Sequence, residues 1–104
     1  MKRNAFAMRL RPDCEAEYKK RHDEIWPELK AELRKVGISN YSIYFDFKTY
    51  TLFAFQNLAD DAENDKLPQK EIVKKWWHMM KDIMYTNPDE SPICDDLREM
   101  FHMD

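Results

Sequence analysis

Glycine and cysteine are scarce in this chain, which has one Gly and two Cys among its 104 residues. The two cysteines, Cys14 and Cys94, lie far apart and match neither a metal-binding nor a redox-active spacing. We therefore expect both to be reduced thiols, as is usual for a protein of the cytoplasm.

Long apolar runs and an excess of basic charge are also missing. No apolar stretch approaches the roughly 20 residues needed to cross a bilayer, and the N-terminus enters charged, alternating sequence without a signal-peptide pattern. The formal net charge is -3, the pI is near 5.6, and basic residues are interleaved with acids. We therefore expect a cytoplasmic protein that binds neither membranes nor nucleic acids.

What is present suits a small globular protein. Hydrophobic residues make up 43% of the chain and charged residues 36%. A length of 104 residues allows one domain with a core, but it is too short to enclose a large cofactor beside a separate substrate site. We expect residues 1–104 to form a single domain.

Hydrophobic periodicity predicts the element order β-α-β-β-α-β. The expected strands cover residues 4–10, 41–47 and 50–56, with a last strand from about Leu97. The first expected helix begins at Pro12-Asp13 and its pattern ends at Gly37, and the second covers residues 68–85. The segment 87–92 is expected to be a loop, because it contains two prolines and an Asn-Pro step.

Three residues mark the start, a break and the end of the first predicted helix. Asp13 is a plausible N-cap. Pro27 lacks the amide of a helix interior, so the helix should kink or restart near Trp26. Gly37 lies where the helical pattern ends, which predicts a C-terminal cap in the left-handed conformation.

A histidine lies on the apolar stripe of this helix. Seven residues fall within an arc of about 100°: Cys14, Tyr18, His22, Ile25, Leu29, Leu33 and Val36. His22 and Tyr18 are one turn apart, close enough to act on one small ligand. On spacing alone, a partly buried histidine with a satisfied hydrogen bond is the more common case, and only the rest of the chain favours a functional histidine.

The second helix has two apolar ridges, displaced by about 100°. Trp76 lies on one and Trp77 on the other, so the two indoles cannot point the same way. Each tryptophan has two interpretations: a core residue, the more common case for either one alone, or a platform for a sugar ring, whose C–H face stacks on indole. Tyr18, Tyr41 and His22 would then supply polar groups.

The predicted hairpin carries large apolar residues on both faces. Phe53 and Phe55 alternate with Leu52 and Ala54 along its second strand. Two helices cover only one face of such a sheet. The other face should therefore meet a second copy of the chain, or line a ligand pocket that loops close.

Several spaced motifs stand out along the whole chain. They are Tyr18-x-x-x-His22-x-x-x-Trp26-Pro27-Glu28, Asn40-Tyr41, Trp76-Trp77, and Asn87-Pro88-Asp89 with Ser91-Pro92. Together they resemble the L-rhamnose mutarotase family. The resemblance implies a ferredoxin-like α+β sandwich, assembled as a dimeric α+β barrel, that interconverts the α and β anomers of L-rhamnose without a cofactor or metal ion. The stretch after Pro92 matches only loosely.

The resemblance also implies roles for individual residues. The family's proton donor matches His22, and its sugar-contacting residues match Tyr18, Tyr41, Trp76 and Trp77. Mutarotation protonates the ring oxygen and deprotonates the anomeric hydroxyl, and positioned acid and base groups worth roughly 10²–10⁴-fold would suffice. We expect His22 to be the principal acid. The base remains open between Tyr18, a carboxylate such as Asp89, and an ordered water.

Two other functions are compatible with such a domain. One is a ferredoxin-like dimeric monooxygenase or haem-degrading protein, for which a haem titration would be diagnostic. The other is a non-catalytic sugar-binding or dimerisation module, which would bind rhamnose without accelerating anomer exchange. Without the resemblance, the residues alone predict only a small α+β domain with an aromatic pocket around one histidine.

Overall fold

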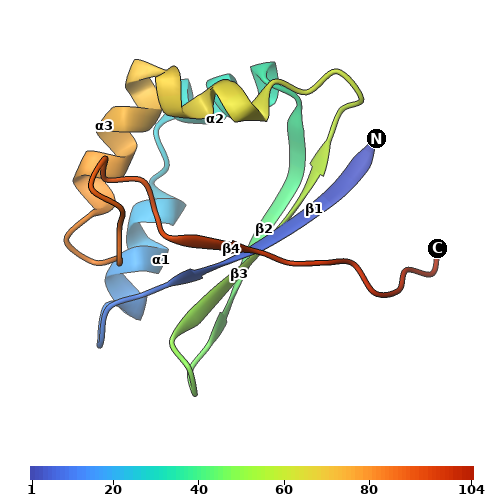
Figure 1. Ribbon diagram of the computed structural model, residues 1–104. Coiled ribbons are helices and arrows are strands. Elements are labelled where there is room, and N and C mark those ends of the chain that lie inside the picture. Colours follow the sequence, from blue (N-terminus) through green and yellow to red (C-terminus); the bar gives the residue numbers. More distant parts are fainter.

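A four-stranded antiparallel sheet, covered on one face by helices, forms the framework of the computed structural model, which describes residues 1–104 (Figure 1). The elements in chain order are β1 (Lys2–Arg9), α1 (Glu15–Asp23), α2 (Pro27–Lys35), β2 (Ile38–Asp46), β3 (Thr51–Leu58), the 3-10 helix η1 (Asn64–Gln69), α3 (Glu71–Met80) and β4 (Cys94–Asp96). The strand order β2-β3-β1-β4 confirms the predicted ferredoxin-like α+β fold.

The first helical region is broken where the sequence predicted a break. Helix α1 ends at Asp23 and α2 begins at Pro27. Trp26, the residue before the proline, is extended with ψ 131°, as the clash with a proline ring requires. The predicted N-cap was wrong: Cys14 occupies that position, while Asp13 has φ 61° and serves the tight turn that follows β1.

Gly37 takes the left-handed conformation that was predicted for it, with φ +101°. A Cβ at this position would lie 3.0 Å from the Cα of Ala62. The close approach has a cause, because Ala59 donates its amide hydrogen to the Gly37 carbonyl at 2.9 Å and Glu63 donates to the Val36 carbonyl at 2.8 Å. The glycine therefore both ends α2 and lets the segment after β3 cross it.

The second half of the chain differs from the prediction in two places. Helix α3 covers Glu71–Met80 rather than residues 68–85, since Pro68 belongs to η1 and the Tyr85 amide donates instead to the Arg9 carbonyl at 3.2 Å. The last strand is Cys94–Asp96, not a strand from Leu97. It pairs with the free edge of β1, so its position follows from backbone pairing and not from side-chain alternation.

The core lies between the helices and one face of the sheet. That face carries Phe6, Met8, Ile43, Phe45, Leu52 and Ala54, which pair across the strands in the observed register. The opposite face carries Tyr44, Phe53 and Phe55, and no helix covers it in Figure 1. Tyr44 is 66% exposed and Phe55 is 45% exposed, so the prediction that both faces are apolar is confirmed. No helix is both long enough and apolar enough to span a membrane.

Candidate active site

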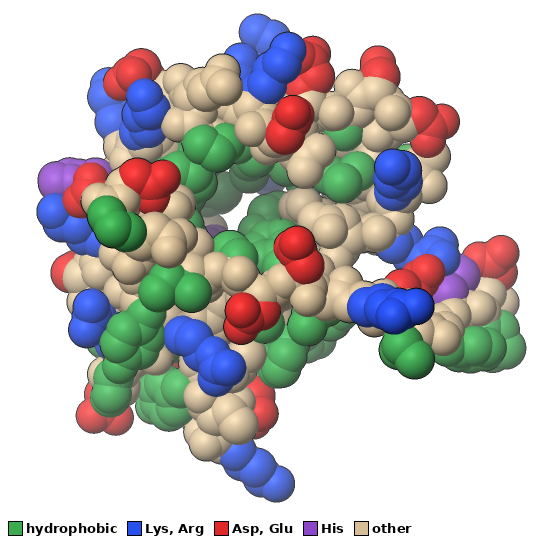
Figure 2. Space-filling view, in the orientation of Figure 1, with side chains coloured by type: hydrophobic (Ala, Val, Ile, Leu, Met, Phe, Trp, Pro, Cys, Tyr) green, Lys and Arg blue, Asp and Glu red, His purple; other side chains and the backbone are tan.

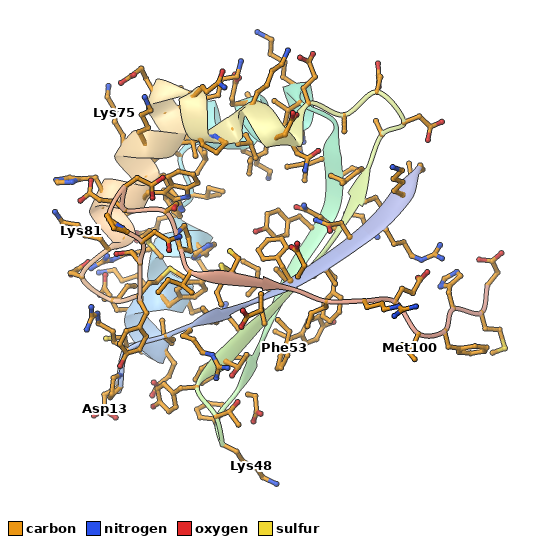
Figure 3. The ribbon with its side chains drawn as sticks, in the orientation of Figure 1. Asp13, Lys48, Phe53, Lys75, Lys81 and Met100 are labelled. Atoms are coloured by element: carbon orange, nitrogen blue, oxygen red, sulfur yellow. The ribbon has the colours of Figure 1, made fainter.

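The predicted site residues come from α1, β2 and α3, which meet between the helical layer and the sheet. Figure 2 shows that the molecule is hollowed there, with hydrophobic side chains around the hollow. Figure 3 shows side chains from the helices and the sheet projecting into this space. Tyr18 and Trp76 are buried, and His22 is half-buried.

His22 is held by its own helix and by two aromatic rings. Its Nδ1 lies 3.1 Å from the backbone carbonyl of Tyr18. Its ring stacks on the Tyr18 ring at a centroid distance of 4.2 Å, and the Trp76 ring meets it edge-on at 5.3 Å. A carbonyl oxygen can only accept a hydrogen bond, so Nδ1 carries the hydrogen and Nε2 remains for a ligand.

Burial controls protonation at this site. Desolvation lowers the pKa of His22, and it outweighs the Tyr18 carbonyl and the nearby Asp23, which both raise that pKa. Burial also raises the pKa of the Tyr18 and Tyr41 hydroxyls well above their usual range. Near neutrality the imidazole is therefore mainly uncharged, and both phenols are hydrogen-bond donors and not bases.

Tyr41 reaches this region because β2 is irregular. The register between β2 and β3 shifts between Ser39 and Ser42, and Asn40 has φ 48°. The Tyr41 ring lies edge-on to Phe6 at 6.5 Å. Tyr41 as a whole is 39% exposed, but its hydroxyl is desolvated. This hydroxyl is near enough to Tyr18 that a Tyr41 phenolate would raise the pKa of Tyr18.

The two adjacent tryptophans differ, as their positions on the helix predicted. Trp76 is 8% exposed and contacts the His22 ring. Trp77 is half-buried and packs against the margin of the core. The structure thus brings Tyr18, His22 and Trp76 into direct contact, with Trp77 on the adjoining surface of α3.

Asp89, one of the candidate bases, is engaged within the loop that follows α3. Its carboxylate accepts a hydrogen bond from the Ser91 amide at 3.0 Å, within its own loop. His78, on α3, is exposed and pairs with Glu90. No group of three or more His, Cys, Asp and Glu side chains is arranged to hold a metal ion.

Two cavities lie toward the β2–β3 hairpin. The first, of about 400 Å³, contains none of the predicted site residues; it is lined by Arg9, Leu10, Pro12, Lys48, Thr49, Tyr50 and Tyr85. The second, of about 310 Å³, has Tyr18 in its wall beside Phe45 and Phe47. Neither is lined by His22, so the aromatic cluster identifies the site better than cavity volume does.

Comparisons with known proteins identify the family of this chain. The family model for L-rhamnose mutarotase matches residues 3–103. The chain belongs to the L-rhamnose mutarotase family. It is 57% identical to an L-rhamnose mutarotase from Bacteroides thetaiotaomicron, and the match covers 100% of both chains. The crystal structure of an L-rhamnose mutarotase from Formosa agariphila matches with a TM-score of 0.93 and 49% identity over 100% of each chain.

In this member of the mutarotase family, the structure adds two residues that were not among the predicted site residues. Trp26 meets Trp76 edge-on at 5.2 Å, and the signal for it was the Trp-Pro step at the helix break. Cys94 pairs with Met8 on the helix-facing side of the sheet. A thiolate at Cys94 would raise the pKa of both Tyr18 and Tyr41. Nothing in the sequence around Cys94 indicated that position.

Proposed function

We propose that this protein interconverts the α and β anomers of L-rhamnose by opening and reclosing the pyranose ring, with no cofactor or metal ion. The observation that carries the proposal is the full-length match to the L-rhamnose mutarotase family, on a chain that places one half-buried histidine among aromatic rings. The same match favours this function over a haem-degrading enzyme and over a non-catalytic sugar-binding module.

His22 is the proposed proton donor. In its cation, the minor form near neutrality, Nε2 carries the proton that is transferred, because Nδ1 is engaged by the Tyr18 carbonyl. Protonation of the ring oxygen and loss of the anomeric hydroxyl proton break the bond between the anomeric carbon and the ring oxygen, which yields the open-chain aldehyde. Rotation about the adjacent C–C bond and closure then form the other anomer. Because its pKa is lowered, the His22 cation is a stronger acid. The neutral imidazole left after the transfer accepts the proton on the return step.

The other four residues are proposed to bind the sugar. Tyr18 and Tyr41 keep their hydrogens at neutral pH, so each can donate a hydrogen bond to a sugar oxygen. Trp76 and Trp77 offer indole surface to the C–H groups of the ring and its methyl substituent.

An ordered water is the proposed partner base. The raised pKa of Tyr18 makes a phenolate a minor species, and the carboxylate of Asp89 is engaged by the Ser91 amide. A water held beside His22 would accept the proton of the anomeric hydroxyl as the ring opens and return a proton to that oxygen as the ring closes to the other anomer. This assignment leaves all proton transfer to His22 and solvent.

The protein is further proposed to be a cytoplasmic homodimer that serves rhamnose metabolism. Two free thiols support the location, since disulfides are uncommon in the cytoplasm. The uncovered sheet face with Tyr44, Phe53 and Phe55 supports the dimer. Pairing two such faces buries the same surface on both subunits and closes the assembly.

Exchange NMR at the anomeric protons of L-rhamnose tests the function directly. We expect the protein to accelerate α/β exchange above the buffer control, equally before and after EDTA treatment. Binding of rhamnose without acceleration would support the non-catalytic module instead. Exchange at the buffer rate would refute the proposed activity.

A further inference from the structure

Cys94 carries a free thiol on the side of the sheet where the candidate active site lies. It belongs to β4, the edge strand next to β1, and it pairs with Met8. Residues that pair across antiparallel strands project to the same side of a sheet. Met8 is 5% exposed and packs in the core with Tyr18 and Trp76. The Cys94 side chain therefore faces the helical layer, and it remains exposed.

The hydroxyls of two tyrosines reach the same edge of the sheet. The Tyr41 ring, from β2, lies edge-on to Phe6 of β1 at 6.5 Å between centroids. Phe6 is two residues before Met8 and on the same face, so the Tyr41 side chain extends toward the edge that carries Cys94. In agreement, a thiolate at Cys94 would raise the pKa of both Tyr18 and Tyr41, which places the sulfur near both hydroxyls.

The Tyr18 hydroxyl lacks a hydrogen-bond partner within the chain, although Tyr18 is only 7% exposed. The one side-chain hydrogen bond at this residue ends on its backbone carbonyl. Buried hydroxyls normally have a partner, and no fully enclosed polar side-chain atom of this chain is without one. The Tyr18 oxygen therefore opens onto the hollow of Figure 2, where it is free to bond a ligand.

We infer that Cys94 forms the sheet-side wall of the sugar site and contacts the bound pyranose. The inference rests on the proposed function. A ligand that bonds the Tyr18 and Tyr41 hydroxyls lies against the Cys94 sulfur, because the sulfur is near both. A thiol behaves as a small hydrophobe and donates only weak hydrogen bonds. Cys94 thus packs against carbon atoms of the sugar and leaves the strong hydrogen bonds to the phenols.

Alkylation by iodoacetamide tests the contact in the unmodified chain. The thiolate sulfur attacks the carbon that bears iodine, a C–S bond forms as iodide leaves, and the thiol proton goes to solvent. With L-rhamnose at ten times its dissociation constant, we expect Cys94 to react about tenfold more slowly, because roughly one site in eleven stays free. Mass spectrometry of the peptides measures the rate at each cysteine separately.

Cys14 is the internal control, since it is the other thiol of the chain and precedes α1. Its sulfur donates to the Pro12 carbonyl at 3.4 Å. We expect its alkylation rate to change by less than about twofold when L-rhamnose is added, because the sugar does not occupy its surroundings. Equal slowing of both cysteines would indicate a general change of the chain, and would overturn the contact.

Blocking the thiol after folding gives a second readout that does not depend on how a variant folds. In Cys14→Ser, Cys94 is the only cysteine, so iodoacetamide adds one carbamidomethyl group at the proposed wall. We expect this group to raise the rhamnose dissociation constant at least about tenfold relative to the same chain before alkylation, because it takes up space that the sugar needs. An unchanged dissociation constant would overturn the contact.

Rhamnose binding and anomeric exchange, measured on the unmodified chain, separate this inference from the proposed function. A chain that neither binds L-rhamnose nor accelerates exchange overturns both. A chain that does both, but whose Cys94 is alkylated equally fast with and without the sugar, overturns the Cys94 contact alone.

Discussion

His22 illustrates how a single residue can be both packed and reactive. Its stacking on Tyr18 and its contact with Trp76 hold the ring in one orientation. The Tyr18 carbonyl then assigns the two ring nitrogens different tasks, one structural and one available to a ligand. Tyr18 and Trp76 therefore fix the orientation of the ring, and the Tyr18 carbonyl fixes which nitrogen carries the hydrogen.

Replacing His22 should separate chemistry from binding. We expect His22→Ala to lose roughly 10²–10⁴-fold of the catalysed exchange rate, while rhamnose binding stays within about tenfold, because the lost group acts on charge that develops during ring opening. The exposed His78 is the matched control, so His78→Ala should keep full activity. Exchange NMR measures both, and a folded, fully active His22→Ala would contradict the assignment.

The lowered pKa of His22 has a consequence for stability. The unfolded chain binds a proton at this histidine more readily than the folded chain, so the folded state loses stability as pH falls below 6.5 through the lowered folded-state pKa. Above pH 6.5 the contribution is fully present. We expect chemical denaturation to show a larger loss between pH 7.5 and 5.5 for the unmodified chain than for His22→Gln. Equal losses would show that His22 is not the group responsible.

The paired tryptophans should respond differently to truncation. Trp76→Ala removes a buried ring that contacts His22 and Trp26, and should cost about 3–5 kcal/mol of unfolding free energy together with weaker rhamnose binding. Trp77→Ala removes a half-buried ring, so it should cost less stability while still weakening binding. Urea denaturation and rhamnose titration measure the two effects, and equal stability losses would contradict this contrast.

At the scale of the elements, the site depends on how α1 is fastened to the end of α3. Arg21, next to His22 on α1, donates to the Met79 carbonyl at 2.7 Å and to Asp82 at 2.8 Å. It also bonds to Glu17 on its own helix at 2.8 Å. These bonds keep His22 against Trp76, so the contact between two helices supports the contact between two site residues.

Gly37, at the end of α2, is the residue between elements whose replacement has the clearest expected effect. An alanine would carry a Cβ 3.0 Å from the Cα of Ala62, in a left-handed conformation that favours glycine. We expect Gly37→Ala to cost about 1–3 kcal/mol of stability, measured by urea denaturation. Ser39→Ala, at an exposed position of β2, is the control, and a change below about 0.5 kcal/mol in Gly37→Ala would contradict the close approach.

The molecule as a whole has one covered and one uncovered sheet face, and this asymmetry predicts its assembly. We expect a homodimer of about twice the 12.7 kDa chain mass. Phe55→Asp should dissociate it, because a charge would enter the paired face. Gln69→Asp, an equal change of charge at an exposed residue of η1, should leave it intact. Light scattering at micromolar concentration measures the mass, and a stable monomer of the unmodified chain would refute the dimer.

The sequence by itself determined the features that depend on neighbouring residues. The helix break before Pro27, the left-handed Gly37 and the alternation along the first three strands follow from local sterics and burial, which act over a few residues. The motifs that include Tyr18, His22 and Trp76 also sufficed to identify the family.

The tertiary structure alone decided the features that depend on distant partners. The strand at Cys94–Asp96 exists because β1 had a free edge, and α3 ends early because the Tyr85 amide donates to the Arg9 carbonyl. Trp26 and Cys94 likewise joined the site only when helices and sheet packed together. Periodicity shows which face of an element is buried but not which distant residue it meets, so only the packed chain reveals these pairings.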